Sequence, residues 1–138
     1  KEGVFDAIAT DHAPHTVVDK ECEFGLAASG ISGLETALGA LMVLVHSGEL
    51  DLMTLIRYLT CEPARVLQIP SGTLRKGSPA DITIFDPEAE WTVEPRRFFS
   101  KGRNTPLAGL TLRGKVMTTL VGGEVVFDGR RPAPGAEQ

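Results

Sequence analysis

The sequence has 138 residues, a formal net charge of −4 at pH 7 and a hydrophobic content of 42%. This length is enough for a hydrophobic core, and the acidic balance argues against nucleic acid or an anionic membrane as a partner. The cysteines, Cys22 and Cys61, form no CxxC pair, which favours reduced thiols in a cytoplasmic protein. The apolar stretch 38–45 is too short to cross a bilayer.

Residues 6–15 read Asp-Ala-Ile-Ala-Thr-Asp-His-Ala-Pro-His. The small apolar first half predicts a strand that is buried on both faces, as in parallel sheets. In barrels of such strands the chemistry lies at the carboxyl end of the strand, where this chain carries Asp11, His12 and His15. A His-x-x-His zinc clamp is one interpretation of the two histidines. We favour a His12 that is hydrogen-bonded within the loop.

The apolar positions of residues 16–32 follow no regular spacing. A stretch of this length without secondary structure is usually functional or disordered. Because it comes directly after the Asp/His cluster, we interpret it as an active-site loop. A plain connector is the alternative.

A helix is predicted over residues 34–45, where apolar side chains follow helical spacing. Ser32 and Glu35 have the spacing of a capping box, which we prefer to a catalytic role for Glu35. Gly48 is placed to end this helix. His46 lies in its last turn, where a structural role is expected.

Two shorter helices are expected next. One covers residues 52–59 with Asp51 as its cap, and the other follows Thr60 and runs through residues 63–67. Pro63 interrupts the helical pattern, which predicts a bend between the two helices.

From residue 70 onward β-branched residues predominate between glycines and prolines. Strands are predicted at 81–86, 91–93 and 115–121, and Gly122-Gly123 predicts a hairpin into residues 124–127. The chain therefore reads as an α/β protein in which a helical half precedes a β half.

Four segments together resemble one enzyme family. They are Thr-Asp-His-Ala-Pro-His at 10–15 and the segments 30–38, 80–86 and 101–106. In order and spacing they resemble the C-terminal portion of dihydroorotases of the long, bacterial-type class, which are cyclic amidohydrolases. The aspartate-histidine segment is the most specific of the four.

The resemblance implies two parts. Residues 1–69 would be the last strand and the helices of a TIM-barrel metal-dependent hydrolase. Residues 70–138 would be part of a small β-sandwich that is built from both ends of the parent chain. The implied reaction is the reversible cyclisation of N-carbamoyl-L-aspartate to L-dihydroorotate in pyrimidine biosynthesis.

The same resemblance assigns roles to single residues. Asp11 matches an aspartate that contacts zinc and acts as the acid/base, and His15 matches a substrate contact. Ser29 and Gly30 match a position where backbone groups hold the substrate ring. We interpret the segment of Arg103 and Asn104 as a turn that ties the β half to the barrel, in preference to a substrate contact.

The other zinc ligands of such an enzyme are not found in this sequence, because His46 is the only further histidine. We therefore expect the chain to be an incomplete fragment that is inactive alone. The resemblance also admits a homodimer or an association with aspartate transcarbamoylase. Two alternatives stay open: a non-catalytic dihydroorotase-like subunit that scaffolds aspartate transcarbamoylase, and a hydantoinase or allantoinase.

Overall fold

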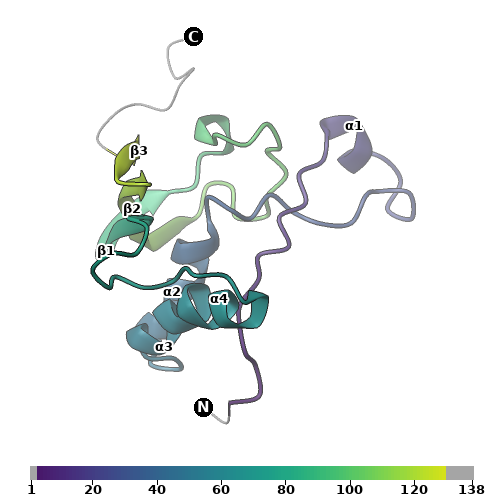
Figure 1. The fold of residues 1–138 in the computed structure, drawn as a ribbon. Helices are drawn as coiled ribbons and strands as arrows, with labels where there is room; N and C mark the ends of the chain where they lie inside the picture. Colours follow the sequence, from purple (N-terminus) through teal and green to yellow (C-terminus); the bar gives the residue numbers. More distant parts are fainter. Residues whose placement is uncertain (1–2, 130–138) are drawn as a thin grey trace.

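An antiparallel sheet forms one layer of the structure, a computed structural model that describes residues 3–129. Its strands β1 (Ile82–Thr92), β2 (Thr111–Val121) and β3 (Glu124–Asp128) lie in that order (Figure 1). The predicted hairpin is confirmed: Gly122 and Gly123 both have positive φ, which the tight turn between β2 and β3 requires. The two strands predicted at 81–86 and 91–93 are one strand, β1, whose pairing with β2 is irregular between Asp86 and Glu90.

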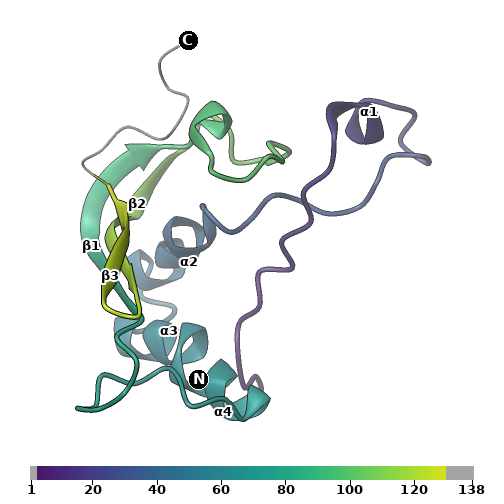
Figure 2. The same ribbon diagram turned by 45° about the horizontal axis from the view of Figure 1, so that its top comes forward.

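Helix α2 (Ala37–His46) packs on the sheet at β2 (Figure 2). Met42 of this helix is 1% exposed. It lies against Gly114 of β2, where a Cβ atom would come within 2.6 Å of the Met42 Cγ. Gly114 also has a φ of +95°, so glycine serves both the backbone conformation and the close approach of helix and sheet.

Helices α3 (Leu52–Leu59) and α4 (Cys61–Leu67) pack on each other. The prediction for α3 is confirmed at both ends, and the Asp51 carboxylate accepts a hydrogen bond from the Thr54 amide as its cap. Thr60 bends the chain between the helices, as expected, but its hydroxyl donates to the Ile56 carbonyl and does not cap α4. Leu55 of α3 is fully buried.

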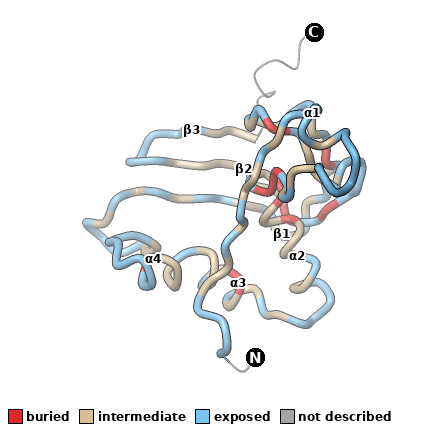
Figure 3. The backbone as a smooth tube through the Cα atoms, turned by 90° about the vertical axis from the view of Figure 1, so that its right-hand side faces the viewer, coloured by how far each residue is buried: buried red, intermediate tan, exposed pale blue. Residues whose placement is uncertain are grey.

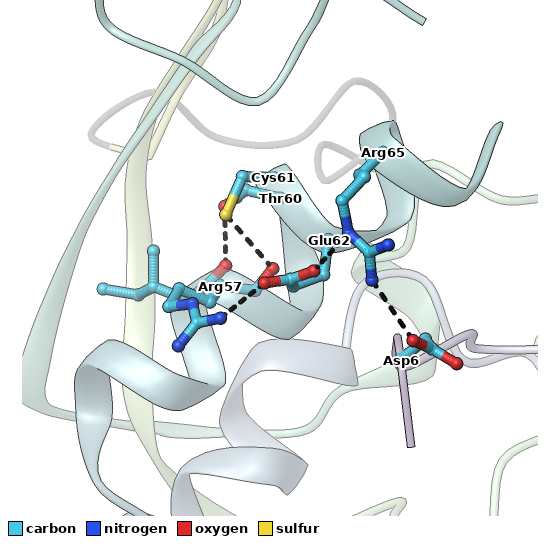
Figure 4. Close-up of polar contacts among 7 residues, drawn as sticks. Asp6, Arg57, Thr60, Cys61, Glu62 and Arg65 are labelled. Carbon is cyan, nitrogen blue, oxygen red and sulfur yellow. Dashed lines mark hydrogen bonds and ion pairs between the residues drawn. The ribbon is translucent and has the colours of Figure 1, made fainter. Parts of the chain in front are cut away.

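A chain of ion pairs ties α3, α4 and the N-terminal segment together (Figure 4). Arg57 and Arg65 both bind the Glu62 carboxylate, and Arg65 reaches Asp6 at 3.2 Å. Hydrogen bonds from Arg57 and then Arg65 lower the pKa of Glu62 below its ordinary value. Since Glu62 stays ionised to lower pH than in the unfolded chain, this network stabilises the fold at neutral pH and loses strength in acid.

The strand predicted in residues 6–10 is not formed. This segment is extended, and its backbone is held by a hydrogen bond from the Ile8 amide to the Tyr58 carbonyl. Val4 and Phe5 just before it are 72% and 76% exposed. The physical reason is that no strand among residues 3–129 lies beside this segment to complete its hydrogen bonds.

The segment 16–30, called the arm from here on, projects from the rest of the molecule (Figures 1 and 2). It contains a single-turn helix, α1 (Val17–Lys20), which the sequence analysis missed. Thr16 and Asp19 form the capping box of this turn. The rest of the arm is irregular, as expected, and Phe24 in it is 97% exposed.

Apart from Leu55 of α3 and Ala64 of α4, the buried positions gather around α2, the start of β2 and the residues that flank the 3₁₀ turn η1 (Pro95–Arg97) (Figure 3). Ser32 and Thr36 are buried there as well. Within residues 3–129, no helix combines the length and the apolar character that crossing a membrane requires.

Candidate functional site

Two loops carry the residues that the sequence singled out, and they lie side by side. The loop 11–15 lies beside the residues that end and follow the arm, and a parallel bridge joins His12 to Ile31, directly after the arm. The Ala13 amide donates to the Ile31 carbonyl at 2.8 Å. The purple and blue segments that cross in Figures 1 and 2 are these two loops.

Asp11 is exposed, and its carboxylate makes no hydrogen bond or ion pair with any of residues 3–129. Its φ is +43°, a left-handed conformation that among non-glycine residues of the described chain recurs only at Gln68. Such conformations are uncommon outside glycine and concentrate at functional sites. The backbone thus presents an unengaged carboxylate at the start of the loop.

His12 is held within the fold by both ring nitrogens. Its Nδ1 accepts hydrogen bonds from the amides of Gly33 (3.1 Å) and Leu34 (3.3 Å). Two donors at Nδ1 require the neutral tautomer with the proton on Nε2, and Nε2 lies 3.4 Å from the Ser100 hydroxyl oxygen. His12 is hydrogen-bonded, as predicted, but its partners lie at residues 33, 34 and 100 and not within its own loop.

Replacement of His12 tests this assignment. His12→Ala leaves the Gly33 and Leu34 amides without their acceptor, which we expect to cost roughly 1–3 kcal/mol of the free energy of unfolding. In His12→Asn the side-chain oxygen can take the place of Nδ1, so most of the stability should return. Denaturant melts of both variants measure this. Equal losses in both, together with a fall in bound metal, would contradict the assignment.

The predicted substrate residues His15, Ser29 and Gly30 lie together. The His15 Nε2 is 2.8 Å from the Ser29 carbonyl oxygen, a bond that this nitrogen makes as the donor. Gly30 has a φ of +114°, and a Cβ atom there would come within 2.4 Å of the Ala13 Cβ. The arm can therefore reach His15 only because residue 30 is glycine.

Lys20 is a residue that the sequence analysis missed. Its Nζ donates to the carbonyls of Ala28 (2.6 Å) and Gly30 (3.1 Å) and so closes the arm on itself. The sequence signal was weak, because Lys20 stands in a short charged run that is typical of an exposed loop.

The capping box predicted for α2 is wrong. The helix begins at Ala37, and Ser32 and Glu35 bind distant parts of the chain instead. The Ser32 hydroxyl donates to the Asn104 Oδ1 at 2.9 Å, and the Glu35 Oε1 accepts from the Ser100 amide at 2.7 Å. Both side chains thus fix the 100–104 loop to the start of the helical half.

The described residues do not form a metal centre of their own. Among residues 3–129, no three histidine, cysteine, aspartate or glutamate side chains lie close enough to hold one ion, whereas a zinc site normally takes at least three protein ligands. His12 has both nitrogens engaged, and the Nε2 of His15 is bound to Ser29. Of the predicted site residues, the unengaged Asp11 can offer one ligand, and these residues do not make a complete site.

A cavity of about 500 Å³ lies elsewhere, between α2, the sheet and η1. Neither Asp11 nor His15 lines it, so it is separate from the loops described above. The Glu35 Oε2 is buried beside it without a hydrogen-bond partner among the described residues. Its aromatic lining residues are Trp91, Phe98, Phe99 and Phe127.

Comparisons with known proteins show which family and which proteins this chain is similar to. The model of the amidohydrolase family matches residues 1–126. The chain is 53% identical over 127 residues to a dihydroorotase of Syntrophus aciditrophicus and 51% identical to one of Anaeromyxobacter dehalogenans. These matches cover 92% of this chain and 30% and 29% of the relatives, so the chain spans about three tenths of their length.

Among solved structures, an L-hydantoinase (dihydropyrimidinase) from Arthrobacter aurescens has a similar fold, with a TM-score of 0.84 and 32% sequence identity. The similarity covers 91% of this chain and 29% of the hydantoinase. The family model extends over most of the chain, from the aspartate-histidine segment to β3. This chain therefore belongs to the amidohydrolase family.

Proposed function

We propose that this chain is the C-terminal portion of a dihydroorotase, which interconverts N-carbamoyl-L-aspartate and L-dihydroorotate. The observation that carries the proposal is the unengaged carboxylate of Asp11, in a left-handed conformation, on the loop that also carries His15. The 53% identity to a dihydroorotase supports this substrate, compared with 32% to a hydantoinase.

Asp11 is proposed as the acid/base. In ring opening its carboxylate takes a proton from the attacking water and returns that proton to the ring nitrogen that leaves. In ring closure the same carboxylate accepts the proton from the attacking carbamoyl nitrogen and protonates the departing oxygen. Exposure of Asp11 leaves its oxygens accessible for both transfers.

His15, Ser29 and Gly30 are proposed to hold the substrate. The hydrogen bond from His15 to the Ser29 carbonyl orients the imidazole relative to the arm. The left-handed Gly30 brings the backbone of the arm beside the same loop. A substrate bound over this junction would meet the imidazole and the backbone polar groups of residues 29–30 together.

Further features of the proposed parent protein follow from the family. Asp11 is proposed as one ligand of a zinc ion whose other ligands lie outside this sequence, so the 138-residue chain alone would be inactive. Residues 1–69 would complete a barrel and residues 70–138 a small β-sandwich. The parent would be cytoplasmic and could form a homodimer or associate with aspartate transcarbamoylase.

The alternatives are separated by a substrate comparison. The full-length protein that carries this chain is expected to hydrolyse dihydroorotate with a kcat/KM at least tenfold above its kcat/KM for hydantoin or allantoin. A preference for hydantoin or allantoin would identify the other cyclic amidohydrolases. No turnover of any ring by metal-loaded, folded protein would favour the non-catalytic subunit.

A further inference from the structure

Asn104 lies where the β half meets both site loops, and its side chain uses all of its hydrogen-bonding capacity. Its Oδ1 accepts from the His15 amide and the Ser32 hydroxyl, each at 2.9 Å. Its Nδ2 donates to the carbonyls of Ala13 and Gly30, each at 3.2 Å. Two acceptor and two donor bonds are the full complement of a side-chain amide.

The backbone of Asn104 adds a fifth bond. The Ser32 amide donates to the Asn104 carbonyl at 2.8 Å, so Ser32 is held through both its amide and its hydroxyl. Ser32 is fully buried. These contacts, called the Asn104 cluster, join segments that are between 72 and 91 positions apart in the sequence.

The Asn104 cluster binds the loop 11–15 and residues 30–32 at the same time. Four direct hydrogen bonds also join the loop 11–15 to residues 29–34: one from the Ala13 amide to the Ile31 carbonyl, one from His15 to Ser29, and two from the Gly33 and Leu34 amides to His12. Asn104 binds the His15 amide in one segment and the Gly30 carbonyl in the other, and both are residues proposed to meet the substrate.

We propose that Asn104 is a positioning residue that sets the distance between His15 and the Gly30 backbone for substrate binding. This inference rests on the proposed function and extends it to a residue that touches neither substrate nor metal. It goes beyond a turn that only ties the β half to the helical half, because the bonds of Asn104 end on the loops of the candidate site.

Both the oxygen and the NH2 group of the Asn104 side-chain amide are needed. An aspartate at position 104 keeps an oxygen for His15 and Ser32 but turns its second oxygen toward the carbonyls of Ala13 and Gly30. Oxygen against oxygen replaces two hydrogen bonds with repulsion. Asn104→Asp therefore changes the link to the loops while it preserves the size of the side chain.

The experiment uses the full-length protein and compares Asn104→Asp with Arg103→Ala, an exposed neighbour, as the matched control. We expect the KM for dihydroorotate to rise about tenfold or more in Asn104→Asp, with kcat changed less than KM. The control should stay within twofold of wild type. A role in stability alone would lower the active fraction, and hence kcat, and leave KM unchanged.

If Asn104→Asp does not fold, Ser32→Ala takes its place, because it removes a single bond of the cluster. A KM rise of about threefold is expected there. An unchanged KM in the folded variant overturns the proposal.

A second readout does not depend on activity. Amide hydrogen exchange of His15 should be at least tenfold faster in Asn104→Ala than in wild type, since its acceptor is gone, while the Thr54 amide at the cap of α3 should not change. If the His15 amide exchanges faster in the variant but the full-length protein has no dihydroorotase activity, the proposed function is refuted. The role of Asn104 in holding the loop 11–15 is then still supported. Unchanged exchange at His15 would overturn the positioning role.

Discussion

Asp11→Asn in the full-length protein is expected to lower kcat for dihydroorotate hydrolysis by roughly 10²–10⁴-fold, the usual cost of losing a general acid/base. Asparagine has the size of aspartate and also tolerates the left-handed backbone that Asp11 adopts. The fold of the loop should therefore persist, and the loss should lie in proton transfer. Steady-state kinetics in both directions of the reaction measure it.

Asp6→Asn is the matched control, because Asp6 is another exposed aspartate of the same N-terminal segment, where it pairs with Arg65. An exposed ion pair contributes little to stability, so this variant should keep kcat within twofold. A kcat of Asp11→Asn within threefold of wild type, with the metal content unchanged, would rule out the acid/base role.

Gly102→Ala is expected to have the second largest effect. A Cβ atom at this buried position would lie 2.2 Å from the Pro14 Cβ and 2.8 Å from the Ser32 Oγ. The 100–104 loop must then move away from the loop 11–15, which weakens the Asn104 cluster. Forcing an added group into a packed contact costs about 1–3 kcal/mol of the free energy of unfolding, which denaturant titration measures.

Gly25→Ala provides the comparison for this variant. No atom lies within 4 Å of a Cβ built at Gly25, and its φ is not positive. Its free energy of unfolding should stay within about 0.5 kcal/mol of wild type. If Gly102→Ala is as stable as Gly25→Ala and binds dihydroorotate normally, the close approach of the 100–104 loop to the loop 11–15 does not matter for the site.

The elements that the sequence predicts well are those fixed by local interactions. Helix α3 has both predicted ends, because its apolar stripe lies within the helix and its cap, Asp51, directly precedes it. The hairpin of β2 and β3 follows from two adjacent glycines. Neither prediction depends on a partner that is distant in the sequence.

Predictions that required knowledge of distant partners failed. Ser32 and Glu35 have the spacing of a capping box, yet Asn104 and Ser100, 72 and 65 positions away, bind them instead. The segment 6–10 has the composition of a buried strand but no strand beside it among the described residues. Local spacing is a weak guide where tertiary hydrogen bonds compete.

The residues of the candidate site likewise divide into those that the sequence indicates and those that depend on distant partners. A short motif points to Asp11 and His15, and the resemblance of one segment to a family points to Ser29 and Gly30. Nothing local to the arm indicates that Lys20 closes it. The interpretation of Asn104 as part of a turn that connects the β half to the rest of the chain is supported by its five hydrogen bonds. Which loops it joins became known only from the structure.

We propose that the junction of the loop 11–15 and the arm binds the ring on which Asp11 acts. A crystal structure of the full-length protein with dihydroorotate bound tests this most directly. We expect the Asp11 carboxylate to lie roughly 2.6–3.2 Å, or one water molecule, from the groups that exchange protons, with His15 and Gly30 touching the ring. Dihydroorotate seated in the aromatic cavity between α2 and the sheet, with Asp11 facing solvent, would contradict it.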